Sequence, residues 1–164
     1  MIFVYNFLQI PLLLGVAPFL ALLIAGRRKY RERFWQRLGF GLQRRAENIN
    51  KTPGAGRIWL HCLSVGEVTS AQPLVRGLRL RMPAARIIVT VTTSSGMRVA
   101  EEQLAPFADL VLAAPLDLLP VINRYIPVLR PDLFILVETD FWPNWLHALR
   151  RRGIPAMLVN GRIS

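Results

Sequence analysis

Cysteine, histidine and acidic residues are all scarce in this chain of 164 residues. The single cysteine, Cys62, excludes an intrachain disulfide, so the protein is not a disulfide-stapled scaffold. His61 directly adjoins Cys62 and only His147 remains, so the spacing of a zinc site is missing and no metal is expected. Asp and Glu number 10 against 21 Lys and Arg, for a formal net charge of +11. This excess indicates anionic partners: nucleic acid, a phospholipid surface or an acidic substrate.

Glycine motifs that bind nucleotides are also missing. The chain has no Gly-x-Gly-x-x-Gly fingerprint, so we expect no dinucleotide cofactor. The segment Thr92–Gly96 is not a P-loop, because no Gly-Lys-Ser/Thr follows it. We therefore expect no cofactor.

One long apolar run opens the sequence. Residues 2–25 carry no charged side chain, and Asn6 and Gln9 are their clearly polar members. A run of roughly 20 apolar residues can cross the hydrocarbon core as a helix, and membrane helices tolerate prolines such as Pro11 and Pro18. We therefore predict an uncleaved, single-pass transmembrane anchor over residues 1–26. A cleaved signal peptide would need basic residues before the run, whereas a segment lying in the membrane interface is the main alternative.

A cluster of basic residues follows this run directly and holds more than half of the net charge. Its members are Arg27, Arg28, Lys29, Arg31, Arg33, Arg37, Arg44 and Arg45. Basic residues beside a membrane helix stay on the cytoplasmic side, so we expect the protein body on the cytoplasmic face of a bacterial inner membrane. The cluster is either a solvated charge run or a surface for lipid phosphates. For the second interpretation the predicted contacts are Arg27, Arg28, Lys29, Arg31 and Arg33.

The remainder of the chain alternates between apolar β-branched runs and helical patterns. Strands are predicted at residues 58–63, 87–92, 110–113, 133–137 and 156–159. Helices are predicted at residues 68–82, 96–104, 118–129 and 142–152. This alternation predicts a Rossmann-like α/β domain with a parallel sheet over residues 58–164. Residues 27–57 are then a basic juxtamembrane segment and linker.

Ligands of such sheets bind beyond the carboxyl ends of the strands, so the loops there are the candidate site. In Ser64–Glu67, Gly66 permits close approach of a ligand to the backbone, and Glu67 stands near a helix amino terminus. Glu67 is either a base kept ionised by the helix dipole or an acid that merely stabilises the helix. The sequence leaves both interpretations open.

Two more of these loops carry candidate residues. Glu138 and Asp140 follow the most hydrophobic strand, where an unpaired charge is costly. Asp140 fits a helix cap with Pro143 in the first turn, which leaves Glu138 as the better functional candidate. The hydroxyls of Thr92–Gly96 fit an anion site or helix caps equally.

Four ordered motifs resemble those of the Kdo transferases, which transfer 3-deoxy-D-manno-octulosonic acid (Kdo) in lipopolysaccharide synthesis. They lie at Trp59–Val68, Val91–Gly96, Leu136–Asn144 and Gly153–Ser164. The basic segment Arg31–Gly39 after the apolar run resembles the same family, so the likeness covers nearly the whole chain.

The resemblance implies the amino-terminal half of a GT-B glycosyltransferase, in which two Rossmann-like domains face one another across a cleft. It implies inverting, metal-independent transfer of Kdo from CMP-Kdo to the lipid A precursor lipid IVA. The family's general base corresponds to Glu67, and Glu138 is the predicted second acid. We also predict substrate contacts from the same loops, at Ser64, Gly66, Thr93, Ser94 and Arg162.

The chain departs from the family pattern in two respects. After Glu138, Asp140 stands where many relatives carry the second Glu of Glu-x-Glu, and its side chain is shorter than the pattern requires. The chain ends at Ser164 without a donor-binding domain, so it is expected to be inactive alone. The alternative is a non-catalytic, membrane-anchored lipid A binding module or a truncated remnant. Nucleic acid is not an expected partner, because the charge is concentrated beside the apolar run.

Overall fold

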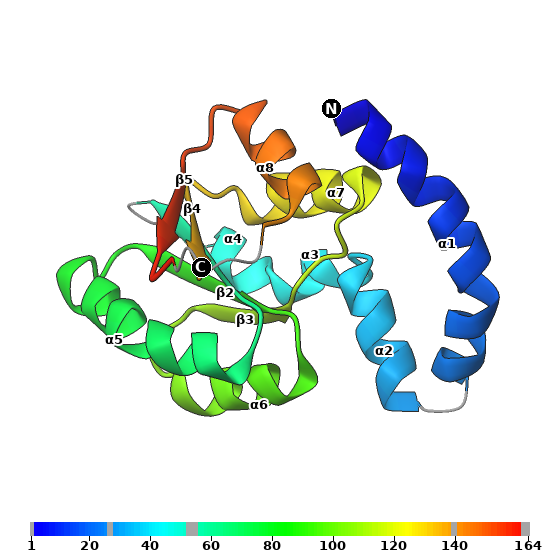
Figure 1. The fold of residues 1–164 in the computed structure, drawn as a ribbon. Helices are drawn as coiled ribbons and strands as arrows, with labels where there is room; N and C mark the ends of the chain where they lie inside the picture. Colours follow the sequence, from blue (N-terminus) through cyan, green and yellow to red (C-terminus); the bar gives the residue numbers. More distant parts are fainter. Residues whose placement is uncertain (1, 26–27, 52–55, 139–140, 162–164) are drawn as a thin grey trace.

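The computed structural model describes residues 2–25, 28–51, 56–138 and 141–161. For Ile10 and for residues 19–25 and 28–32 it describes the backbone alone. Five parallel strands form one sheet in the order β3-β2-β1-β4-β5 (Figure 1). Their bounds are Arg57–Cys62 (β1), Arg86–Val91 (β2), Leu110–Ala113 (β3), Leu133–Val137 (β4) and Ala156–Val159 (β5). The predicted Rossmann-like parallel sheet is confirmed, with each strand within one residue of its expected position.

Helices cover both faces of the sheet, because neighbouring strand residues point to opposite sides. Ile87 and Leu60 belong to a core beneath α5 (Val65–Arg81) and α6 (Ser94–Gln103). Ile88 and Trp59 belong to a second core beneath α7 (Leu119–Leu129) and α8 (Pro143–Arg150). The apolar runs of the sequence are therefore strands buried on both faces.

Part of the predicted linker is helical. The structure places α3 (Leu42–Arg45) and α4 (Glu47–Lys51) within residues 39–57. Leu42, Ala46 and Ile49 are buried in the second core, against α7. The Gly and Asn residues of this segment suggested a linker, although Leu42, Ala46 and Ile49 are apolar. The segment therefore covers part of the second core and is more than a connection between the basic segment and the sheet.

An N-terminal arm of two helices, α1 (Ile2–Ala25) and α2 (Arg28–Arg37), lies along one side of the sheet domain (Figure 1). Within the described residues, no helix combines the length and the apolar character that a membrane crossing requires. The predicted transmembrane span is therefore not supported. The described part of α1 instead directs Tyr5, Asn6 and Gln9 to hydrogen-bond partners in the sheet domain.

Candidate functional site

The loops after neighbouring strands are joined by backbone hydrogen bonds at the carboxyl end of the sheet. The N–H groups of Thr92 and Thr93, after β2, donate at 3.1 and 3.0 Å to the carbonyls of Cys62, the last residue of β1, and Leu63. On the other side of β1, the Glu138 N–H donates to the Val159 carbonyl at 2.9 Å. The predicted site loops therefore lie side by side, as the topology requires.

Glu67 occupies the first turn of α5 at this end of the sheet. Ser64 is the N-cap residue, and its hydroxyl accepts a bond from the Glu67 N–H at 3.4 Å. The Glu67 carboxylate reaches back and accepts the Leu63 N–H at 2.5 Å. The pair of bonds resembles a capping box, except that the carboxylate accepts the N–H of Leu63, the residue before the N-cap, and not that of Ser64. Glu67 is 5% exposed, so its side chain is held in a defined position.

The charges of Glu67 and Glu138 both affect the buried Cys62 thiol. Burial, followed by the charges of Glu67 and Glu138, raises the pKa of the Cys62 thiol well above its usual range. Cys62 is therefore an inert, protonated core residue at the end of β1. Both predicted acids therefore lie near enough to the end of β1 for their charges to act on this thiol.

Glu138 has an unusual backbone conformation. Its φ is 64°, in the left-handed region that side chains other than glycine rarely adopt. Asn160, the residue after β5, has a φ of 54° and donates to the Glu138 carboxylate at 3.3 Å. Strained residues of this kind gather at functional sites. Sequence reasoning did not select Asn160, and its position in the motif that follows β5 was the available signal.

The hydroxyl-rich loop after β2 consists of a helix cap and an exposed helix start. Thr93 is the N-cap of α6 and accepts the Gly96 N–H at 3.1 Å. Gly96 packs so closely that a Cβ there would lie 3.1 Å from the Ser64 carbonyl carbon. The helix starts of α5 and α6 therefore adjoin, with Gly66 and Ser94 exposed. Of the predicted substrate contacts, Arg162 lies outside the described residues.

Three buried polar groups that the sequence analysis did not select complete this end of the sheet. His61 is fully buried between the Thr90 hydroxyl, 3.1 Å from Nδ1, and the Trp142 indole N–H, 3.3 Å from Nε2. Nε2 therefore accepts a hydrogen bond from the Trp142 indole, and Nδ1 faces the Thr90 hydroxyl. Asp117 and Asn144 are the other two, 7% and 0% exposed.

Asp117 and Asn144 fix the arm to the sheet domain. The Asp117 carboxylate accepts the Tyr5 hydroxyl at 2.7 Å and the Trp145 N–H at 3.2 Å. It thereby caps α8, the helix for which Asp140 was the predicted cap; Asp140 lies outside the described residues. Asn144 accepts a bond from Asn6 at 2.8 Å and donates to the Asp117 carbonyl at 2.8 Å. Pro143 stands in the first turn of α8, as predicted.

The structure separates the basic residues that were predicted to contact lipid phosphates. Arg27 lies outside the described residues, and Arg28, Lys29 and Arg31 lie on α2 with side chains that are not described. The Arg33 side chain is half-buried and donates to the Thr92 carbonyl at 2.8 Å.

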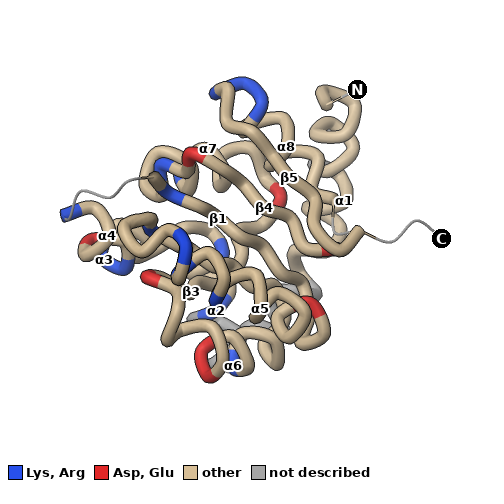
Figure 2. The backbone as a smooth tube through the Cα atoms, turned by 90° about the vertical axis from the view of Figure 1, so that its left-hand side faces the viewer, with Lys and Arg blue, Asp and Glu red and all other residues tan. Residues whose placement is uncertain are grey.

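Other basic residues gather where α8 ends (Figure 2). Arg152, in the turn after α8, donates to the Ala148 carbonyl at 3.2 Å, as expected for a cation at the end of a helix.

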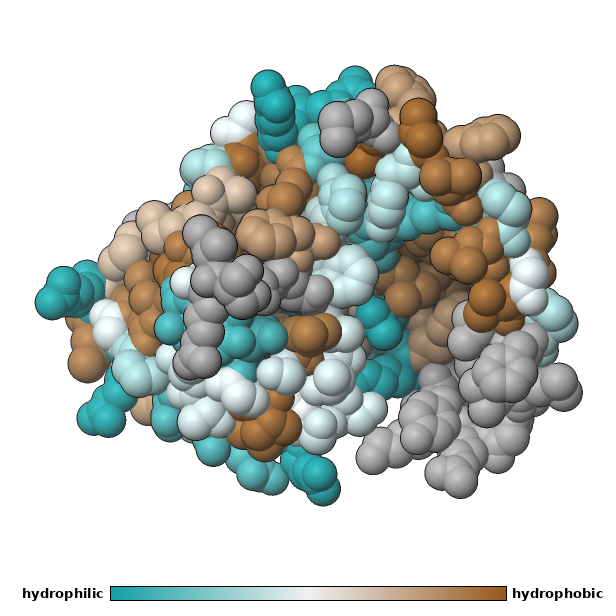
Figure 3. All heavy atoms as spheres, viewed as in Figure 1, coloured by the Kyte–Doolittle hydropathy of each residue, from teal (hydrophilic) through white to brown (hydrophobic). Residues whose placement is uncertain are grey.

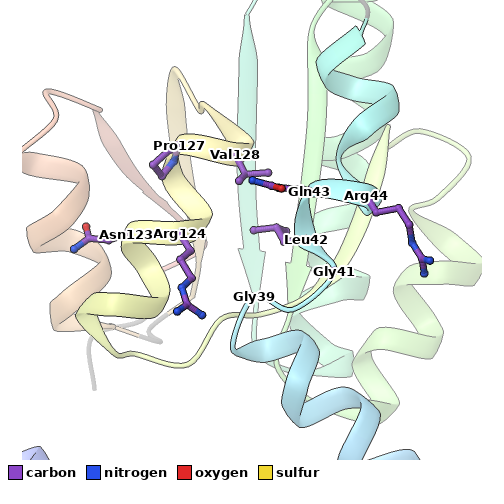
Figure 4. A pocket seen from close by; sticks show the side chains of 9 residues that line it. All are labelled: Gly39, Gly41, Leu42, Gln43, Arg44, Asn123, Arg124, Pro127 and Val128. Atoms are coloured by element: carbon purple, nitrogen blue, oxygen red, sulfur yellow. The ribbon is translucent and has the colours of Figure 1, made fainter.

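A cavity of about 590 Å³ between α3 and α7 lies apart from these loops (Figure 4). Its lining comes from Gly39, from residues 41–44 and from α7, including Asn123 and Arg124, and does not include Glu67 or Glu138. Among the described residues, no group of three or more His, Cys, Asp or Glu is placed to hold a metal ion. The carboxyl end of the sheet therefore remains the candidate site.

The motifs and the fold agree with a comparison to known protein families. Residues 32–164 match the family described as 3-deoxy-D-manno-octulosonic-acid transferase (kdotransferase). The chain belongs to this family. The Kdo transferase of Haemophilus influenzae is 38% identical over 98% of this chain and 37% of its own length. That of Chlamydia muridarum is 36% identical over 65% of this chain and 25% of its own length.

Other similarities are more distant. A probable mitochondrial Kdo transferase of Arabidopsis thaliana is 32% identical over 99% of this chain and 35% of its own length. The chain thus spans between a quarter and two fifths of these Kdo transferases. Among solved structures, a UDP-GlcNAc 2-epimerase from Neisseria meningitidis aligns with 63% of this chain and 32% of its own, at 15% identity and a TM-score of 0.44.

Proposed function

We propose that this chain forms the acceptor-side part of a Kdo transferase that moves Kdo from CMP-Kdo to lipid IVA, with Glu67 as the general base. The observation that carries the proposal is the Glu67 carboxylate, fixed by the Leu63 N–H at the carboxyl end of β1. The family motifs and the Kdo transferase relatives support the reaction class.

The chemistry requires a carboxylate in such a position. The acceptor is a sugar hydroxyl, a weak nucleophile, and a positioned base takes its proton as the new bond forms. The leaving group is cytidine monophosphate, a stable anion, so an acid on the protein is less necessary. We therefore propose that the acceptor hydroxyl displaces cytidine monophosphate directly, with inversion and without a metal. Glu67 accepts the hydroxyl proton, and Glu138 is a second essential acid.

The donor requires a second domain. We propose a GT-B arrangement in which residues 58–164 handle the acceptor and a carboxy-terminal domain holds the nucleotide of CMP-Kdo. A GT-B site is built at the interface of its two domains, so this chain alone is expected to bind the acceptor without turnover.

We further propose that the protein works at the cytoplasmic face of a bacterial inner membrane, with α1 lying in the membrane interface. Tyr5, Asn6 and Gln9 bond the sheet domain, whereas Phe3 (86% exposed) and Phe7 (72% exposed) leave apolar surface uncovered. Hydrophobic side chains gather along α1 in Figure 3. A helix that exposes apolar side chains beside the protein body suits the boundary between headgroups and acyl chains. Of the basic residues after α1, we propose Arg28, Lys29 and Arg31 as the contacts to anionic headgroups, because Arg33 and Arg37 bond the sheet domain.

The test of the function is a transfer assay with CMP-Kdo and lipid IVA, with a carboxy-terminal region of a Kdo transferase supplied to this chain. Replacing Glu67 by Gln should lower the rate by roughly 10²–10⁴-fold while the far-ultraviolet circular dichroism is retained. Glu102→Gln, an exposed glutamate on α6, is the matched control and should retain the rate. Full activity of the Glu67 variant would remove Glu67 as the base. Binding of lipid IVA without transfer in every combination would favour the non-catalytic binding module.

A further inference from the structure

Helix α2 crosses the carboxyl ends of two neighbouring strands. The Arg33 guanidinium donates to the carbonyl of Thr92, the first residue after β2, at 2.8 Å. Arg37 donates from Nε to the carbonyl of Ala114, the first residue after β3, at 3.0 Å. The carboxyl end of α2 is fixed by the Leu116 N–H, which donates to the Arg37 carbonyl at 3.1 Å.

The spacing of the two arginines matches the spacing of the strands. Arg33 and Arg37 stand four residues apart, one turn of an α-helix, which advances about 5.4 Å. Neighbouring strands lie about 4.8 Å apart. A helix laid across the sheet end therefore presents one arginine to each strand end. This helix belongs to the basic segment for which the sequence analysis considered only solvent and lipid phosphates.

The loop that Arg33 holds is bonded to the loop that holds Glu67 by two separate backbone hydrogen bonds. The Thr92 carbonyl shares its peptide group with the Thr93 N–H, which donates to the Leu63 carbonyl at 3.0 Å. The Thr92 N–H donates to the Cys62 carbonyl at 3.1 Å, and that carbonyl shares its peptide group with the Leu63 N–H. The Leu63 N–H in turn donates to the Glu67 carboxylate at 2.5 Å. The two sets of bonds pass through different peptide groups and meet at Thr92 and Leu63, so Arg33 acts on the Glu67 donor by holding the loop in place.

The environment of Arg33 suits a residue that holds other groups in place. Partial burial lowers the pKa of the Arg33 guanidinium from its ordinary value, while the charge of Glu101 opposes that shift. A cation that gives up hydration in this way needs a fixed acceptor, and the Thr92 carbonyl supplies it.

We propose that Arg33 is a positioning residue for Glu67, which it reaches through the Thr92–Thr93 loop and the Leu63 N–H. Arg33 touches no reacting atom in this role. It fixes the loop that supplies the hydrogen-bond donor to the base, and so it ties the geometry of the base to the docking of the arm. This inference rests on the proposed function for the role of Glu67.

Amide hydrogen exchange in the 164-residue chain tests this role without an activity assay. Arg33→Ala should accelerate exchange at the Thr93 and Leu63 N–H groups by about tenfold or more, because the loop loses a charge-assisted hydrogen bond. Arg33→Lys retains a donor and should recover part of the protection. Arg98→Ala, an exposed arginine on α6, should leave both amides unchanged. Wild-type exchange at both amides in a folded Arg33→Ala variant overturns the proposal, and so does a uniform increase across β1, β2 and β4.

The transfer assay supplies a second measurement. In the reconstituted enzyme, Arg33→Ala should lower kcat by about 10- to 100-fold and leave KM for CMP-Kdo unchanged, because a misplaced base slows the chemical step. An unchanged kcat, or a loss confined to KM, overturns the proposal. If Glu67→Gln keeps full activity, the proposed base fails, whereas the exchange result still decides whether Arg33 holds the loop. If Glu67→Gln is inactive and the exchange result is negative, only the role of Arg33 fails.

Discussion

The two ends of the sheet hold their carboxylates in different ways. At the amino end, Asp109 forms ion pairs with Arg79 and with Arg86, at 2.8 Å for Arg86, and accepts the Ile87 N–H at 2.8 Å. At the carboxyl end, Glu67 accepts the Leu63 N–H, and Asp117 accepts a tyrosine hydroxyl and backbone N–H groups of α8. Ion pairing at the amino end neutralises charge, whereas the bonds described at the carboxyl end fix the direction of each carboxylate.

The difference fits the position of the proposed site. Burial by itself raises the pKa of Asp109, but the bonds from Ile87, Arg86 and Arg79 outweigh it and leave that pKa below its usual value. Asp109 therefore stabilises the fold through these bonds. A carboxylate that is to accept a substrate proton has to be oriented toward the substrate, and the helix starts at the carboxyl end provide that orientation.

The largest expected effect on stability is that of Asp117→Ala. The change leaves the buried N–H groups at the start of α8 and the Tyr5 hydroxyl without this acceptor, which should cost about 3 kcal/mol of unfolding free energy. Urea unfolding measures the loss. Asp132→Ala is the matched control at the amino end, where an exposed carboxylate accepts the Arg57 N–H at 2.7 Å, and it should cost about 1 kcal/mol or less. Equal losses in the two variants would abolish the proposed contrast.

Asp109→Asn should cost about 2 kcal/mol and leave transfer activity intact. The variant loses two ion pairs whose arginine side chains are 25% and 22% exposed, so solvent reduces the effect below that of a fully buried pair. Urea unfolding and the reconstituted transfer assay measure the two properties separately. A lower kcat in an Asp109→Asn variant that is fully folded would show that the amino end of the sheet also contributes to the reaction.

Acid should remove the contribution of Asp109. Its pKa is lowered in the folded state, so its stabilisation is present above the ordinary value of 3.8 and is lost as the pH falls below that value. The difference in unfolding free energy between wild type and Asp109→Asn should therefore shrink from neutral pH to about pH 3. A difference that is constant over this range would mean that the ion pairs contribute little.

The smallest effect compares two glycines. A Cβ at Gly96 would lie 2.8 Å from the Thr93 hydroxyl and 2.9 Å from a Val91 methyl, so Gly96→Ala should push α6 from the Ser64 loop and cost about 1–2 kcal/mol. Gly77→Ala, in α5 with no neighbour within 4 Å, should instead stabilise by about 0.5–1 kcal/mol. Thermal unfolding distinguishes the opposite signs. A stabilising Gly96→Ala would mean that the two helix starts do not need their close approach.

The sheet could be predicted because its signals are local. Runs such as Ile87–Thr92 are apolar and β-branched without polar alternation, which is typical of strands buried on both faces. The segment at 39–57 was predicted less well, because Leu42, Ala46 and Ile49 are isolated among polar residues and glycines. Their burial depends on α7, which lies far along the chain.

The sequence by itself determined the parallel α/β fold, the family and the place of Glu67 at a helix start, because Ser64 and Glu67 interact over three residues. Only the tertiary structure decided the partners of Arg33, Tyr5 and Asp117. The Arg33–Thr92 contact joins residues 59 apart, and the Tyr5–Asp117 contact joins residues 112 apart. No local pattern encodes such pairs, since they form only when the arm and the sheet meet. The same reason explains why an apolar run that suggested a membrane-spanning helix in the sequence instead presents a polar side to the sheet domain.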